Sequence, residues 1–299
     1  MLRFSSTRLH IRALCAFTFP ARCGKMAEIK NKTIWGDQMD WKQELAHLAQ
    51  DKDEAMLLTR VCDRLFTAIL RETPAASCFL SPREQALAQQ LLRGQPVVFF
   101  GGTAESERKL CCYLPEYLDE SWLWSEDGPI AAVRAQFHAS EHPSHRDFLG
   151  ALMGCGVKRE TVGDMYVAED SCDFLLTREI LPYLLQNLTA AGRTHLRLAP
   201  LALSDVRVPE AKTKTIRDTV SSLRLDSVVA SGFGLSRAKA AAAIESGKTE
   251  LNHLPCLKPD RLVCAGDWIS VRGLGKLRLT DVLGTTKKGR TGITISRFA

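Results

Sequence analysis

The order of predicted elements between residues 130 and 201 restricts the fold more than any other feature of the chain. A strand pattern is followed by a helix, two strands, a second helix and a last strand. The expected bounds are Ile130–Phe137, Ser144–Gly154, Asp164–Ala168, Cys172–Thr177, Ile180–Leu188 and His195–Leu201. This βαββαβ order is typical of a ferredoxin-like fold. We predict such an α+β domain over residues 95–204, where short strands near residues 97–100 and 110–114 come first.

A helical unit is expected before this domain, over residues 39–94. Its apolar residues recur at three- and four-residue steps, as along one side of a helix. Ser81-Pro82-Arg83-Glu84 has the form of a capping box with proline at the first helical position. We therefore expect one of these helices to begin just after Ser81.

The first 38 residues carry seven basic and two acidic side chains. This composition resembles an organelle transit peptide, but Met26 and Met39 are both plausible start residues. Two interpretations stay open, a targeting segment or upstream sequence translated from a misplaced start. We favour the second, and expect residues 1–38 to be a disordered extension outside the fold.

The net charge changes sign along the chain. It is +5 over residues 1–38, −7 over residues 39–204 and +8 over residues 205–299, which gives +6 in total. A basic C-terminal third on an acidic body indicates one unit that binds a polyanion. We expect a polar linker at residues 205–218 and a separate domain at residues 219–299.

Several other classes of function are excluded by the composition. No apolar run approaches the roughly 18 to 20 residues of a membrane-spanning helix, so membrane insertion is not expected. The ten cysteines form no C-x-x-C pair, and the histidines at 138, 142 and 145 lack partners at a metal-binding spacing. Gly273-Leu274-Gly275 lacks the third glycine of a dinucleotide site. We predict no metal, no cofactor and no catalytic residues.

The cationic residues of the C-terminal domain are expected to surround one helix start and one sheet face. Ser236 can cap a helix that has Arg237 and Lys239 in its first turn, where basic residues oppose the helix dipole unless a phosphate lies there. Alternation along the strands gives the sheet a basic outer face, and Arg224 is expected to point outward from the preceding helix. The predicted RNA-binding residues are Arg224, Ser236, Arg237, Lys239, Lys248, Asn252, Arg272, Lys276, Lys287, Lys288 and Arg290.

The same segment resembles a known RNA-binding module. The matching motifs are Arg224-Leu225-Asp226, Leu235-Ser236-Arg237-x-Lys239, Ile244-x-x-Gly247-Lys248, Asn252 and Gly266-Asp267. They are similar to the S-four domain of a small-subunit ribosomal protein, pseudouridine synthases and tyrosyl-tRNA synthetases. The asparagine of that family is usually followed by glycine, where this chain has His253.

Motifs upstream of this module extend the resemblance to the YlmH family, from about residue 39 to the C-terminus. They are Ser81-Pro82-Arg83-Glu84-Gln85, Phe99-Phe100-Gly101-Gly102, Glu107-Arg108-Lys109, His145-Arg146-Asp147-x-Leu149-Gly150-x-Leu152-Met153, Val157-Lys158-Arg159-Glu160-x-x-Gly163-Asp164 and Thr219-Val220-Ser221-Ser222-Leu223-Arg224-Leu225-Asp226. Arg146, Lys158 and Arg159 are candidates for a second RNA or ribosome contact. The alternative is that Arg146 and Asp147 make structural polar contacts.

The resemblance implies a function in ribosome-associated quality control. Members of the family are associated with Gram-positive cell-division gene clusters and bind obstructed large ribosomal subunits that carry a peptidyl-tRNA. We therefore expect a monomeric, cytoplasmic, ribosome-associated protein without catalytic activity that binds rRNA, tRNA or both. Two alternatives remain: an RNA-modifying enzyme related to pseudouridine synthases, for which residues 95–204 are too short, and a septum-associated cell-division factor.

Overall fold

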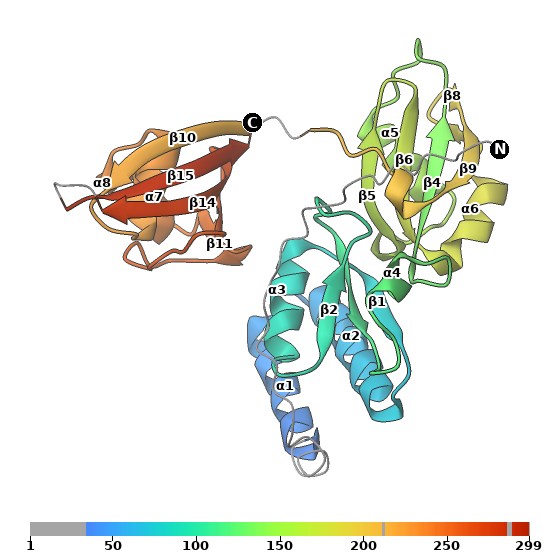
Figure 1. The fold of residues 1–299 in the computed structure, drawn as a ribbon, viewed down its shortest axis with the longest axis horizontal. Coiled ribbons are helices and arrows are strands. Elements are labelled where there is room, and N and C mark those ends of the chain that lie inside the picture. The colour runs from blue at the N-terminus through green and yellow to red at the C-terminus, as the bar shows by residue number, and fades with distance from the viewer. Residues whose placement is uncertain (1–33, 211–212, 286–288, 299) are drawn as a thin grey trace, which may run out of the picture. The chain divides into compact units, whose positions relative to one another are not determined.

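The computed structural model describes residues 34–210, 213–285 and 289–298 (Figure 1). Most of the expected extension and the two lysines Lys287 and Lys288 lie outside the described residues. Helix α1 (Ile34–Leu48) begins before residue 39, so the expected start of the first helix was too late. No helix among the described residues combines the length and the apolar composition needed to cross a membrane.

The first sheet has three antiparallel strands in the order β1-β3-β2. Its strands are β1 (Ala75–Leu80), β2 (Val97–Phe100) and β3 (Lys109–Tyr113), and its helices are α2 (Lys52–Arg71) and α3 (Pro82–Leu91). The expected boundary at residue 94 therefore runs through a sheet, and the segment 39–94 is not purely helical. The prediction failed because β1 is short and pairs with a strand about 30 residues further along the chain.

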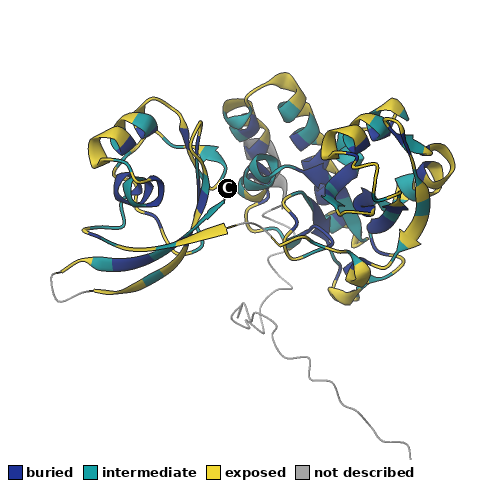
Figure 2. Cartoon of the chain, turned by 90° about the horizontal axis from the view of Figure 1, so that it is seen from above, coloured by how far each residue is buried: buried dark blue, intermediate teal, exposed yellow. Residues whose placement is uncertain are grey.

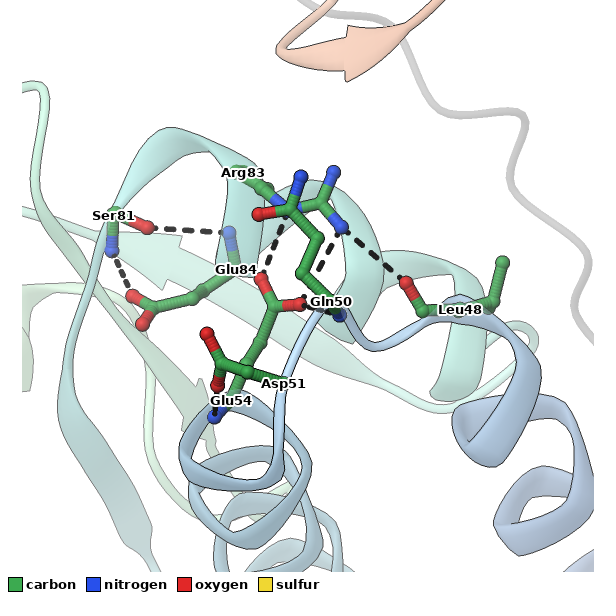
Figure 3. A network of polar contacts seen from close by, with 7 residues as sticks. All are labelled: Leu48, Gln50, Asp51, Glu54, Ser81, Arg83 and Glu84. Carbon is green, nitrogen blue, oxygen red and sulfur yellow. Dashed lines mark hydrogen bonds and ion pairs between the residues drawn. The ribbon is translucent and has the colours of Figure 1, made fainter.

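The predicted capping box of α3 is confirmed and lies inside a larger polar network (Figure 3). The Ser81 Oγ accepts from the Glu84 amide at 3.3 Å, and the Glu84 carboxylate accepts from the Ser81 amide at 2.5 Å. Arg83 reaches away from this box and donates to the Glu54 carboxylate at 2.9 Å and to the Leu48 carbonyl at 3.3 Å. These contacts join the end of α1, the start of α2 and the start of α3.

The second sheet has the order β5-β6-β4-β9 with antiparallel neighbours, which is the strand order of a ferredoxin-like fold. Helices α5 and α6 cover one of its faces, where Phe148 and Leu184 are fully buried against strand residues such as Phe174. Its strands are β4 (Ile130–Gln136), β5 (Val162–Val167), β6 (Ser171–Thr177) and β9 (Arg197–Leu201), and the helices are α5 (His145–Gly154) and α6 (Leu181–Asn187). Helix α4 (Ser121–Trp124) precedes the sheet, and a small hairpin of β7 (Ala190–Ala191) and β8 (Thr194–His195) lies between α6 and β9.

An ion pair is buried on the other face of this sheet. Arg134 on β4 donates two hydrogen bonds of 2.7 Å to the Asp173 carboxylate on β6, and the Arg207 amide donates a third at 2.8 Å. The side chain of Asp173 is 2% exposed. These contacts fix the segment that leaves the sheet after residue 205.

Asp173→Asn should lower the free energy of unfolding by about 2–3 kcal/mol, because the half-buried Arg134 guanidinium loses its counter-charge. Urea unfolding followed by circular dichroism measures this loss. Glu169→Gln, an exposed change of the same charge next to the same strand, is the control and should be neutral. A loss below about 0.5 kcal/mol in the Asp173 variant would contradict a stabilising role for the pair.

The C-terminal sheet has six strands in the order β10-β15-β14-β13-β11-β12, and all neighbours are antiparallel. The strands are β10 (Thr213–Val220), β11 (Thr249–Leu251), β12 (Leu254–Pro255), β13 (Trp268–Val271), β14 (Gly275–Thr285) and β15 (Thr291–Phe298). Helices α7 (Leu225–Phe233) and α8 (Arg237–Glu245) pack on one face through Val228, Val229 and Ile244. Helix α7 is buried along most of its length, whereas α8 keeps an exposed outer side (Figure 2).

The predicted linker at residues 205–218 is wrong in its second half, where the chain forms strand β10. Residues 213–218 pair with β15 in continuous register, so they belong to the C-terminal sheet. The segment lacks apolar alternation because β10 is an edge strand whose side chains are mostly exposed, and backbone pairing holds it in place. Below, the C-terminal domain means residues 213–298.

Candidate nucleic-acid interface

The start of α8 has the predicted geometry. Helix α7 ends at Gly234, whose φ of +67° turns the chain, and α8 begins two residues later with Ser236 as its N-cap. The Ser236 Oγ accepts from the Lys239 amide at 3.3 Å. Arg237 and Lys239 are exposed in the first turn, which contains no acidic residue. Two cations and the free amides of a helix start therefore face solvent together, an arrangement that favours a bound anion.

Asp226 organises the cations beside this helix start. Arg224 donates to its carboxylate at 3.1 and 3.3 Å, and Arg237 donates to it at 3.1 and 3.4 Å. The Asp226 side chain is only 5% exposed, whereas those of Arg224 and Arg237 are 37% and 51% exposed. We call Arg224, Asp226, Arg237 and Lys239 the α8 cluster. The expectation that Arg224 points freely outward was wrong, because its guanidinium is bonded to this carboxylate.

The pKa of Asp226 reflects the two arginines. Burial by itself would raise the pKa of this carboxyl, but the hydrogen bonds and positive charges of Arg224 and Arg237 outweigh burial and lower it below its ordinary value. The carboxylate stays ionised at neutral pH and holds both guanidiniums on one side of the domain. Asp226 was part of a sequence motif but was not predicted as a site residue, because its role depends on a contact across the α7–α8 turn.

Asn252 has a structural role in a tight hairpin. It lies between β11 and β12, and it and the next residue have positive φ angles of 50° and 66°. Its side-chain amide donates to Asp267 at 2.9 Å, and its side-chain carbonyl accepts from the Trp268 amide at 2.9 Å. Since both ends of the side chain are bonded within the domain, Asn252 shapes the hairpin. Its contact with RNA stays a prediction, because the side chain is exposed and its amide has a second N–H.

The remaining predicted cations that the structure describes in the C-terminal domain lie in three places. Lys248 and Arg272 are exposed and adjacent, since the Arg272 amide donates to the Lys248 carbonyl at 2.8 Å. Lys276 lies on β14, on the face of the sheet opposite the helices. The Arg290 guanidinium donates to the Thr219 carbonyl and ties the start of β15 to β10. The structure thus groups four predicted residues around α8, and Arg290 lines the same surface pocket as Arg237.

The upstream candidates separate into exposed and bonded side chains. Arg146 and Lys158 are exposed. Arg159 donates to the backbone carbonyls of Val162 and Gly163, at 2.6 and 3.4 Å, which indicates a structural role. Asp147 forms a capping box with Ser144 at the start of α5, so for Asp147 the alternative of a structural polar contact is confirmed.

Other motif residues of the upstream region are also structural. The Asp164 carboxylate accepts from the backbone amides of Glu107 and Arg108. The Arg108 guanidinium donates to the carbonyls of Phe79 and Val162, at 2.7 and 3.1 Å. Arg108 and Asp164 therefore join β1, β3 and β5 through backbone groups.

Comparisons with known proteins match two parts of this chain to family models. The family model "S4 domain" matches residues 223–269, which include the α8 cluster, and the model "Putative RNA-binding domain in YlmH" matches residues 136–205. The chain is 35% identical over 224 residues to ribosome-associated protein quality control protein P2 of Bacillus subtilis (strain 168), covering 73% of this chain and 85% of that protein. A solved structure, cell division protein ylmH from Streptococcus pneumoniae, aligns with a TM-score of 0.43 and 16% identity over 54% of this chain and 98% of that one.

The fold and the matched domains define an α+β RNA-binding protein with an S4 domain. More narrowly, the chain belongs to the YlmH family. This confirms the resemblance seen in the sequence.

Proposed function

We propose that this protein binds structured rRNA or tRNA on the large ribosomal subunit and acts, without catalysis, in the quality control of stalled nascent chains. The observation that carries the proposal is the α8 cluster, in which one buried carboxylate orients two arginines beside a capped helix start. The B. subtilis relative, named for ribosome-associated quality control, supports the cellular setting. Both matched domain models concern RNA binding, which supports a binding role over an enzymatic one.

The recognition we propose is of shape and phosphate position. Guanidiniums and helix-start amides contact phosphate oxygens, and such contacts fix orientation on a folded RNA with little reading of sequence. Lys248 and Arg272 extend the cationic surface of the C-terminal domain. Arg146 and Lys158 on the preceding domain are proposed as a second contact, with Arg159 left out because of its backbone bonds.

The binding should depend strongly on salt. About five phosphate contacts release about five counterions, so log Kd should rise with log salt with a slope of roughly 3 to 5. Co-sedimentation of the purified protein with isolated large and small subunits, over 50 to 300 mM potassium chloride, measures the slope of log Kd against log salt. It also measures the preference for one subunit over the other. Large subunits that carry a peptidyl-tRNA should retain the most protein.

Two results would overturn the proposal. The first is affinity for neither subunit nor tRNA at physiological ionic strength, and the second is affinity that does not change with salt. Mass spectrometry of RNA from a deletion strain tests the enzymatic alternative, which requires a missing modification that purified protein restores. Septal enrichment of a functional fluorescent fusion without ribosome co-sedimentation would instead favour a cell-division factor.

A further inference from the structure

The sheet of the C-terminal domain carries aromatic side chains on the face opposite its helices. Ile269, Leu277 and Ile295 point toward α7 and α8 and are fully buried, so their strand neighbours Trp268 and Phe298 lie on the other face. The Trp268 and Phe298 ring centroids are 4.9 Å apart with an interplanar angle of 35°. We call His253, Trp268 and Phe298 the aromatic cluster.

The strand register places this cluster among cations. Trp268 on β13 is paired with Arg278, and Phe298 on β15 is paired with Lys276, so the two rings meet above β14 between these residues. The Lys276 ammonium lies 5.1 Å and the Arg278 guanidinium 5.6 Å from the Trp268 ring centroid. Large π surfaces with adjacent positive charges match the two parts of a nucleotide, its base and its phosphate.

The neighbours of the cluster on the same face are small. Ser270 is paired with Lys276 on one side, and Ser296 is paired with Arg278 on the other. Trp268 and Phe298 are half-buried, and α7 and α8 pack on the opposite face of the sheet. Glu250 is also on this face, on β11 opposite Ser270, whereas Lys276 and Arg278 lie over β14.

His253 holds an unfavourable backbone conformation beside this cluster. Its φ of +66° is in the left-handed region, which costs a residue other than glycine about 1–2 kcal/mol. Its ring lies 6.3 Å from that of Trp268. Burial lowers the pKa of His253, and the charge of Lys276 lowers it further although Glu250 opposes this, which favours the neutral imidazole. A strained backbone conformation in a hairpin suggests that its side chain has a function.

We propose that the aromatic cluster stacks an unpaired base of single-stranded RNA next to the folded RNA held at α8, while Lys276 and Arg278 bind the flanking phosphates. The inference rests on the proposed function and deepens it, since it gives the domain two RNA surfaces on opposite faces of one sheet. The α8 cluster takes a folded backbone, and the aromatic cluster takes a nucleotide whose base is free to stack.

The test uses the full chain and two fluorescent RNA probes, a blunt stem-loop and the same stem-loop with a single-stranded 3′ extension. Fluorescence anisotropy should show tighter binding of the extended probe by about tenfold, as expected for one or two stacked bases. Trp268→Leu should remove this difference without changing the affinity for the blunt probe. Trp268→Phe keeps an aromatic ring and should retain most of the difference.

His253→Gly separates recognition from folding. Glycine relieves the positive φ, so this variant should melt at the same or a higher temperature, yet its preference for the extended probe should fall severalfold. Arg237→Glu with Lys239→Glu should weaken both probes alike.

Equal affinity of the wild-type chain for the two probes would overturn the stacking proposal and leave the proposed function intact. An unchanged preference in Trp268→Leu would do the same. Affinity for neither probe would contradict both.

Discussion

Charge reversal at the start of α8, Arg237→Glu with Lys239→Glu, is expected to weaken binding to large ribosomal subunits by about 100-fold or more at 100 mM salt. Each lost charge-assisted contact to phosphate accounts for about 1.5–3 kcal/mol, and the new carboxylates repel the RNA. The slope of log Kd against log salt should fall by about 2, because two phosphate contacts are lost. Co-sedimentation across a salt series measures both quantities.

The control for this variant is Lys52→Glu with Arg64→Glu, which makes the same charge change at exposed positions on α2. It should leave the affinity within about threefold of wild type, because neither position is among the proposed RNA contacts and exposed charges are screened by salt. Because a glutamate at 237 would also face Asp226, Arg237→Gln with Lys239→Gln serves as a milder second variant. If both α8 variants, folded by circular dichroism, bound like the control, the α8 cluster would not be the interface.

Asp226→Asn should have the second large effect, and on two properties. The free energy of unfolding should fall by about 1–3 kcal/mol, less than for a fully buried pair because both arginines are partly exposed. RNA affinity should fall by about tenfold although the protein loses a negative charge, because Arg224 and Arg237 lose the carboxylate that orients them. Urea unfolding and anisotropy with the stem-loop probe measure the two changes.

A fall in RNA affinity together with a rise in net charge would identify Asp226 as a positioning residue. Glu245→Gln, an exposed change of equal charge at the other end of α8, should keep or slightly raise the affinity. Increased RNA affinity in the Asp226 variant would mean that the net charge of the surface matters and the arrangement of its arginines does not.

The pH dependence of stability gives an independent check on Asp226. Its folded pKa is lowered below the ordinary value of 3.8, so its stabilising contribution is fully present above about pH 4. The contribution is lost as the pH falls through the lowered pKa. Between pH 5 and pH 2 the wild-type chain should therefore lose more stability than Asp226→Asn.

Elements with strong local patterns were predicted from the sequence. The βαββαβ order was visible because each of its helices and strands has its own periodicity, and the caps at Ser81 and Ser236 follow from short local motifs. The strands β1 and β10 were missed or misassigned, because each is held by pairing with a distant strand and β10 is mostly polar. The local sequence of a strand does not indicate which distant strand it will pair with.

In the candidate site, too, only residues with a local sequence signal were predicted. Arg237 and Lys239 were predicted because a helix start with basic residues is a local signal, and the structure places them as expected. The shared carboxylate of Asp226 and the aromatic cluster were missed, because both bring together residues from separate elements. Asn252 was assigned to RNA from the family motif, although its amide is used to close a hairpin.

The position of β15 has a consequence for biosynthesis. The ribosome makes β10 first and β15 last among these strands, yet β15 lies between β10 and β14 in the sheet. Ile293 and Ile295 are fully buried there, so the hydrophobic interior stays open to water until residues 291–298 have left the exit tunnel. A chain cut short by even its last strand would expose that interior and become a substrate for cellular proteases.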